Sequence, residues 1–268
     1  MGKLKSRLKK GGLFILVIYL MISGLLYTLQ EKMLFLPTTL EQDYTFQFET
    51  PFEEVFLQPE KDVSINALHF KAKQPKGVIL YFHGNAGDLS RWGGIAEYFV
   101  QYGYDVFIID YRTYGKSKGS LSEQAFYDDA KFCYDHLKKN YKEEDIVIYG
   151  RSLGTGIASH LASNNAPKQL ILETPYHSIA DVAQRRFPIF PVKYLLKYQF
   201  KTFEFLPKVK CPIHIFHGTE DKVVPFQSGK KLTQLDVKNL DFTTIVGGKH
   251  NNLSGFEAYH RGMGLVLE

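Results

Sequence analysis

Three polar residues of this 268-residue chain lie in short segments that could support nucleophilic catalysis. Ser152 lies between glycines in GRSLGTG (150–156), Asp221 lies in HGTEDKVVP, and His250 lies in VGGKHNN. A serine hydroxyl becomes an effective nucleophile when a base removes its proton, and a carboxylate can orient that base and stabilise its cation. We therefore take Ser152 as the candidate nucleophile, Asp221 as the candidate acid and His250 as the candidate base.

Other acidic and imidazole side chains could take part in the same chemistry. Glu220 adjoins Asp221, and Glu173 ends another apolar run, so either could be the acid if the loops are shaped differently. His83 and His217 each precede a glycine, and we expect both to shape loops by hydrogen bonding to the backbone. Nothing in the sequence resembles a zinc-ligand spacing or a disulfide framework, and the two cysteines are expected to be free, packed thiols.

Apolar runs alternate with segments of helical periodicity along most of the chain. The runs predicted as strands are 77–84, 105–110, 145–150, 169–175, 211–218 and 240–248, preceded by two alternating patterns at 54–58 and 63–72. The segments predicted as helices are 91–104, 122–140, 153–165, 225–235 and 253–267. This alternation predicts an α/β fold with a mostly parallel sheet and helices on both faces. Functional loops of such sheets lie at the carboxyl ends of the strands, and each of the three candidates follows a predicted strand.

Residues 176–206 interrupt the alternation and are predicted to form an excursion of short helices. Within it, seven Phe and Tyr residues between 187 and 205 are interleaved with five Lys and Arg residues. One interpretation is a small cap whose aromatic side chains pack on the sheet while its charges stay solvated. The other is an apolar acyl pocket with a basic rim near an anionic lipid surface.

Twenty uncharged residues, 11–30, lie between Lys10 and Glu31 near the N-terminus. As a helix they would span about 30 Å, which is the thickness of a bilayer core. Five basic residues precede them, so the positive-inside rule predicts a single-pass helix with a cytoplasmic N-terminus. A cleaved signal peptide is the alternative, but the run is longer than a usual signal core and no A-x-A-like cleavage site follows it.

The formal net charge of +5 comes from this N-terminal region. Residues 1–32 hold six Lys and Arg and one acidic residue, and the rest of the chain carries equal numbers of basic and acidic groups. Nucleic-acid binding usually requires a basic domain rather than a basic tail on a neutral body. We therefore expect no nucleic-acid partner.

Five motifs in order give the chain a resemblance to the α/β-hydrolases over about residues 50–268. They are HGNAG (83–87), DYRTYGKSKG (110–119), GRSLGTG, HGTEDKVVP and GGKHN. The order Ser, Asp, His is the one found in nucleophile-elbow enzymes. The chain looks most like membrane-anchored serine hydrolases, which include bacterial esterase-like proteins and eukaryotic protein depalmitoylases. It departs from them at Thr113, where related chains usually have glycine, and this departure affects a loop near the site.

The resemblance implies an α/β-hydrolase fold and a Ser152–His250–Asp221 triad that works through an acyl-enzyme. It also implies an oxyanion hole formed by the backbone amides of Leu153 and Asn85, and it implies no metal or organic cofactor. The expected substrate is a small-molecule or lipid-like acyl ester or thioester. A serine peptidase of the same fold and a non-catalytic binding or scaffold protein are the alternatives.

These expectations divide the chain into three parts. Residues 1–31 would form the basic N-terminus and transmembrane anchor, residues 32–51 a connector, and residues 52–268 the catalytic domain with a cap insertion at 176–206. The positive-inside rule places the catalytic domain on the extracytoplasmic side of the membrane, which is the periplasm if the source is a bacterium.

Overall fold

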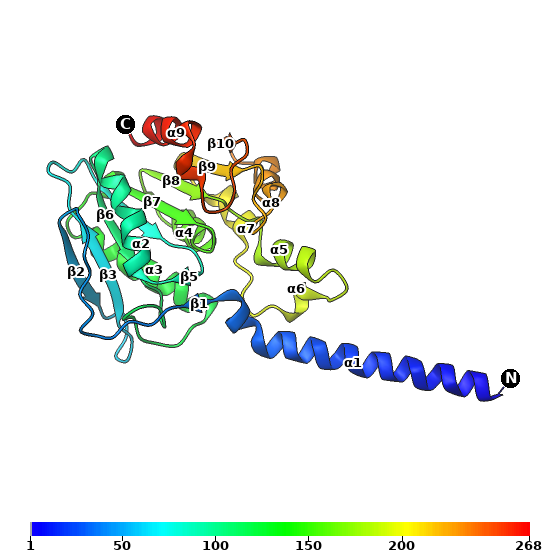
Figure 1. The fold of residues 1–268 in the computed structure, drawn as a ribbon. Helices are drawn as coiled ribbons and strands as arrows, with labels where there is room; N and C mark the ends of the chain where they lie inside the picture. Colours follow the sequence, from blue (N-terminus) through cyan, green and yellow to red (C-terminus); the bar gives the residue numbers. More distant parts are fainter. Residues whose placement is uncertain (1) are drawn as a thin grey trace.

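An eight-stranded sheet forms the centre of the computed structural model, which describes residues 2–268 (Figure 1). The strands are β2 (Phe52–Leu57), β3 (Ile65–Phe70), β4 (Val78–Phe82), β6 (Asp105–Ile109), β7 (Ile146–Arg151), β8 (Gln169–Glu173), β9 (Ile213–Gly218) and β10 (Leu240–Ile245). Their order is β10-β9-β8-β7-β4-β6-β3-β2. β3 pairs antiparallel with β2 and with β6, and all other neighbours are parallel. The predicted α/β-hydrolase fold with a mostly parallel sheet is confirmed.

Helices cover both faces of the sheet, so its central strands are buried on both sides. α3 (Glu123–Leu137) and α4 (Gly154–Ser163) pack on one face, and α2 (Leu89–Ala96) and α9 (Glu257–Leu267) pack on the other. Successive residues of β4 alternate between these two cores, as the pleat of a strand requires. This double burial explains why the strands read as continuous apolar runs.

Several α-helices end at other residues than predicted. The predicted helix 91–104 is α2 followed by a 3-10 helix, Glu97–Tyr102, and it ends at Gly103, which has φ 78°. The predicted helix 225–235 is likewise α8 (Phe226–Lys230) continued by a 3-10 turn, Lys231–Gln234. α3 begins as expected, because the Ser122 side chain accepts a hydrogen bond from the backbone N–H of Ala125.

One long helix, α1 (Gly2–Leu34), extends away from the sheet at the N-terminal end (Figure 1). Its segment 5–34 is long and apolar enough to cross a membrane. The helix continues three residues past the predicted boundary at residue 31, and Met1 lies outside the described residues. The predicted connector then forms a two-residue strand, β1 (Leu36–Pro37), which pairs in parallel with β5 (Ala86–Gly87).

The segment 176–206 consists of short helices, as expected. They are α5 (Ile179–Arg186), α6 (Val192–Leu195) and α7 (Thr202–Phe205). α5 and α6, which we call the cap helices, lie beside the C-terminal half of α1 (Figure 1). Aromatic side chains of this segment therefore contact α1 and the residue that follows it: Phe190 stacks on Tyr19, and Tyr198 packs edge-on against Phe35.

Candidate active site

Ser152 lies on the sharp turn between β7 and α4. Its backbone has φ 50°, a left-handed conformation that is strained for a residue with a side chain. The flanking glycines make this turn possible. A Cβ on Gly154 would overlap the carbonyl oxygen of Phe82, and one on Gly150 would crowd the methyl group of Ala158. The turn therefore holds the serine hydroxyl above the end of the sheet, as a nucleophile elbow does.

The structure brings the three candidate residues into one hydrogen-bonded chain. Ser152 Oγ lies 2.9 Å from His250 Nε2, and His250 Nδ1 lies 2.7 Å from Asp221 Oδ2. An ionised carboxylate can only accept, so Nδ1 carries a proton and Nε2 is free to accept from the serine hydroxyl. The three residues are 8%, 9% and 6% exposed, so water screens these contacts poorly.

The Asp221 carboxylate remains charged in this buried position. Burial raises its pKa, but hydrogen bonds from His217 and His250 lower it more, and the net result is a pKa of about 2. Its Oδ1 atom also accepts from the backbone N–H groups of Val223 and Val224, at 2.8 and 2.9 Å. The carboxylate is thus fixed in place and ionised at neutral pH.

Neither alternative acid contacts His250 in the structure. Glu173 forms a buried ion pair with Arg151, at 3.2 Å between Oε1 and Nε, and Glu220 is exposed. His217 Nε2 donates to the carbonyl oxygen of Val224 at 3.0 Å. His83 Nδ1 similarly lies 2.6 Å from the carbonyl oxygen of Gly84. Both histidines therefore shape loops, as the sequence predicted.

The HGNAG loop passes directly beside the serine. A Cβ placed on Gly84 would lie 3.7 Å from Ser152 Cβ. Within residues 2–268, the backbone N–H groups of Leu153 and Asn85 donate to no other protein group. Two free amides beside a serine hydroxyl could stabilise an oxyanion that forms on an attacked carbonyl.

Hydrogen bonds to the backbone and the side chain of Asn85 hold this loop in place. The carbonyl oxygen of Asn85 accepts from Tyr114 Oη and from the backbone N–H of Leu36, each at 2.9 Å. The Asn85 side chain donates to the carbonyl oxygen of Leu34 at 3.1 Å. Sequence reasoning missed the contacts of Leu34 and Leu36, because a two-residue strand has no periodicity to detect.

Arg151 is a second residue that sequence reasoning left unassigned. Its guanidinium lies over the ring of Trp92 and reaches the carbonyl oxygen of His250 at 3.4 Å, while Glu173 neutralises it. The residue therefore joins the elbow to the His250 loop. The sequence signal for this role was the position of Arg151 directly before Ser152 in the G-x-S-x-G motif.

Thr113 occupies a strained position in the loop that follows β6. Its φ is 74°, in the region that glycine adopts freely, and its hydroxyl is buried without a hydrogen-bond partner within residues 2–268. Glycine would adopt this backbone conformation without the strain. The next residue is Tyr114, which holds Asn85.

Comparisons with known proteins find hydrolases among the relatives of this chain. A family model described as serine aminopeptidase, S33, matches residues 73–199. The lysophosphatidylserine lipase ABHD12 of Danio rerio is 29% identical over 93% of this chain and 80% of its own length. The enzyme of the same name from Xenopus tropicalis is 32% identical over 85% of this chain and 71% of its own length.

A similar fold is found in solved structures. The esterase Pf2001 of Pyrococcus furiosus superposes with a TM-score of 0.66, and the match covers 87% of this chain and 97% of that one. The two sequences are 16% identical, so this likeness concerns the fold alone.

Proposed function

The chain belongs to the α/β-hydrolase superfamily, among the relatives of the ABHD12 lipases, and is a serine hydrolase of the lipase and esterase type; on this premise we propose that Ser152, His250 and Asp221 are its catalytic triad. The observation that carries the proposal is the hydrogen-bonded chain from Ser152 Oγ through His250 to Asp221. No triad member is missing, which argues against a purely non-catalytic scaffold.

The proposed reaction proceeds through an acyl-enzyme. Ser152 Oγ attacks the carbonyl carbon of the ester or thioester while His250 Nε2 takes the hydroxyl proton. The backbone amides of Leu153 and Asn85 stabilise the oxyanion, and His250 then gives the proton to the departing alcohol or thiol. Water, activated by the same histidine, attacks the acyl carbon and releases the acid and free Ser152.

We propose a lipid-like acyl ester as the substrate. Relatives of this chain are named as lysophosphatidylserine lipases, which supports a lipid that carries one acyl chain. A peptidase shares this triad, and the matched family model is described as an aminopeptidase. Hydrolysis of an aminoacyl amide in preference to an acyl ester would favour that second candidate.

We also propose that α1 anchors the protein in a membrane. Basic residues precede its uncharged stretch, so the N-terminus would be cytoplasmic and the catalytic domain extracytoplasmic. The division into an anchor (1–31), a connector (32–51) and a catalytic domain (52–268) is part of this proposal. Resistance of the membrane-bound protein to carbonate extraction tests the anchor, and a shortened soluble product would contradict it.

The catalytic proposal is tested by labelling the full chain with a fluorophosphonate probe in mild detergent. The unmodified protein should be labelled, whereas Ser152→Ala should lose labelling entirely and His250→Ala should lose most of it. Ser159→Ala is the matched control, because Ser159 lies in α4 and bonds only to the Thr155 carbonyl oxygen. Unchanged labelling of Ser152→Ala, or no labelling of the folded unmodified chain, would contradict the proposal.

A further inference from the structure

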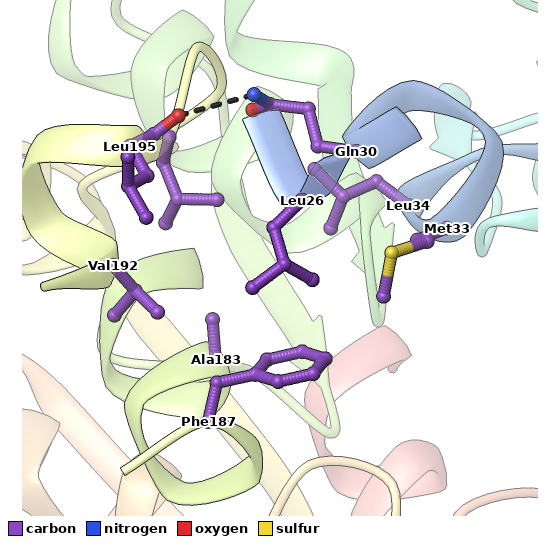
Figure 2. A pocket seen from close by; sticks show the side chains of 9 residues that line it. Leu26, Gln30, Met33, Leu34, Ala183, Phe187, Val192 and Leu195 are labelled. Atoms are coloured by element: carbon purple, nitrogen blue, oxygen red, sulfur yellow. Dashed lines mark hydrogen bonds between the residues drawn. The ribbon is translucent and has the colours of Figure 1, made fainter. Parts of the chain in front are cut away.

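A cavity lies between the C-terminal end of α1 and the cap helices (Figure 2). It has a volume of ≈ 70 Å³. Its walls are lined by Leu26, Gln30, Met33 and Leu34 of α1 and by Ala183, Phe187, Val192, Leu195 and Leu196 of the cap. Eight of these nine residues are apolar. The cavity therefore favours an apolar occupant, because cavities with such walls do not hold water well.

Gln30, the polar exception, has its amide group fully engaged. Its Nε2 donates to the carbonyl oxygens of Tyr27 and Leu195 at 2.8 and 3.1 Å, the second of which is drawn in Figure 2. Its Oε1 accepts from the backbone N–H of Lys197 at 2.7 Å. Gln30 thus joins α1 to the cap and leaves no polar group for a ligand in the cavity.

The cavity lies at the end of the part of α1 that we assign to the membrane: Leu26 and Gln30 belong to the uncharged stretch 11–30, and Met33 and Leu34 follow it. Tyr19 contacts the cap, with its hydroxyl donating to the carbonyl oxygen of Ile189 at 3.1 Å and its ring stacked on Phe190. Gln30 contacts it eleven residues later, about 16 Å along the helix axis. The cap therefore runs beside the uncharged stretch 11–30, on the side towards the catalytic domain.

The outer surface of the cap suits a bilayer. Ile189 and Tyr194 are 72% and 83% exposed, which is unusual for such large apolar or aromatic side chains. Arg185, Arg186 and Lys193 are exposed on the same segment. Long basic side chains can keep their charges at lipid headgroups while apolar neighbours contact acyl chains.

Leu34 connects the cavity to the loop that carries the proposed oxyanion hole. Leu34 lines the cavity, and its carbonyl oxygen accepts the hydrogen bond from the Asn85 side chain. Leu36, two residues later, donates its backbone N–H to the Asn85 carbonyl oxygen. A chain held in the cavity would thus have the catalytic loop as its neighbour.

We propose that this cavity binds part of the acyl chain of a membrane lipid ester that reaches Ser152 sideways from the bilayer, between α1 and the cap helices. The inference rests on the proposed function and adds the place and route of the acyl chain. One water-sized group needs about 10–15 Å³ of such volume, so the cavity has room for about five methylene-sized groups. The remainder of a long chain would lie along α1 in the lipid.

The proposal is tested by filling the cavity in the full chain, reconstituted in phosphatidylcholine vesicles. Ala183→Phe places a ring in the cavity, and Ala180→Phe is the matched control on α5, since Ala180 faces a different hollow. Each variant is assayed with glycerol monoesters of four and sixteen carbons. Ala183→Phe should reduce kcat/KM at least tenfold for the long ester and less than twofold for the short one, whereas Ala180→Phe should affect the two esters equally.

Fluorophosphonate labelling separates this inference from the proposed function. If Ala183→Phe is labelled at Ser152 as fast as the unmodified protein, its triad is intact and the chain-length comparison is decisive. Equal loss for both esters, or no loss for the long one, would overturn the cavity proposal while leaving the triad proposal in place. A second variant, Leu26→Ala, enlarges the cavity and should shift the preference towards longer chains, and a shift towards shorter chains would also overturn it.

Discussion

Glycine at position 113 should make the protein more stable than alanine there, although glycine is usually the less stable of the two. Thr113 has φ 74°, and a left-handed backbone costs a residue with a side chain about 1–2 kcal/mol. Glycine removes that cost but gains about 0.5–1 kcal/mol of conformational freedom in the unfolded chain. Thr113→Gly should therefore exceed Thr113→Ala in stability by about 0.5–1 kcal/mol.

The comparison with alanine isolates the backbone effect. Both variants lose the methyl group and the hydroxyl of Thr113, which is buried without a partner within residues 2–268, so these changes cancel. A difference of this size corresponds to about 2 °C in the midpoint of thermal unfolding for a domain of this length. The assay is thermal unfolding of the full chain in one detergent at one scan rate.

The same pair of substitutions at Thr155 provides the control. Thr155 lies inside α4 with a helical backbone, and both variants lose its hydrogen bond to the Ser152 carbonyl oxygen. Here glycine should be less stable than alanine by about 1 kcal/mol. If Thr113→Gly were no more stable than Thr113→Ala, the strain assigned to Thr113 would be wrong.

Three further predictions concern the triad acid and the elbow. Asp221→Asn should fold but lose about 10⁴-fold in kcat for ester hydrolysis, because an amide cannot stabilise the histidine cation, and a loss below tenfold would speak against its role. The pKa of Asp221 is lowered from 3.8 to about 2, so its ionisation stabilises the fold above pH 4. The stability advantage over Asp221→Asn should therefore shrink as the pH falls from 4 to 2, as measured by urea unfolding. Gly154→Ala should prevent stable folding because its Cβ overlaps the Phe82 carbonyl oxygen, whereas Gly264→Ala, which meets no atom within 4 Å, should be tolerated in a solubility and thermal-unfolding comparison.

The sheet could be predicted because its central strands are buried on both faces and carry unbroken apolar runs. The runs at 77–84 and 145–150, for example, correspond to β4 and β7. Parallel strands end at the same edge of a sheet, so the loops after β7, β9 and β10 had to meet there. This is why Ser152, Asp221 and His250 could be chosen before their distances were known.

Contacts that depend on side-chain packing between distant segments could not be predicted. The bond between Gln30 and Leu195 joins residues 165 apart, and no local pattern in either segment indicates the other. The β1–β5 pair is too short to show a periodic sequence pattern. The sequence indicates the positive φ of Thr113 only because the family resemblance predicts glycine at that position. The sequence indicated two interpretations of the cap, and the structure adds contacts of Phe190 with Tyr19 of α1 and of Tyr198 with Phe35, the residue after α1.

The short connection between α1 and β1 limits the distance that the active site can move from α1. Only Phe35 separates the end of the helix at Leu34 from the paired residue Leu36, and Phe35 itself is buried. A flexible linker of n residues would let a domain explore about 5–6 Å × √n from its anchor. This chain has no such linker, so with α1 in a bilayer the catalytic serine would stay at a fixed height. Such an enzyme would act on lipids in its own membrane and would not reach across to a neighbouring one.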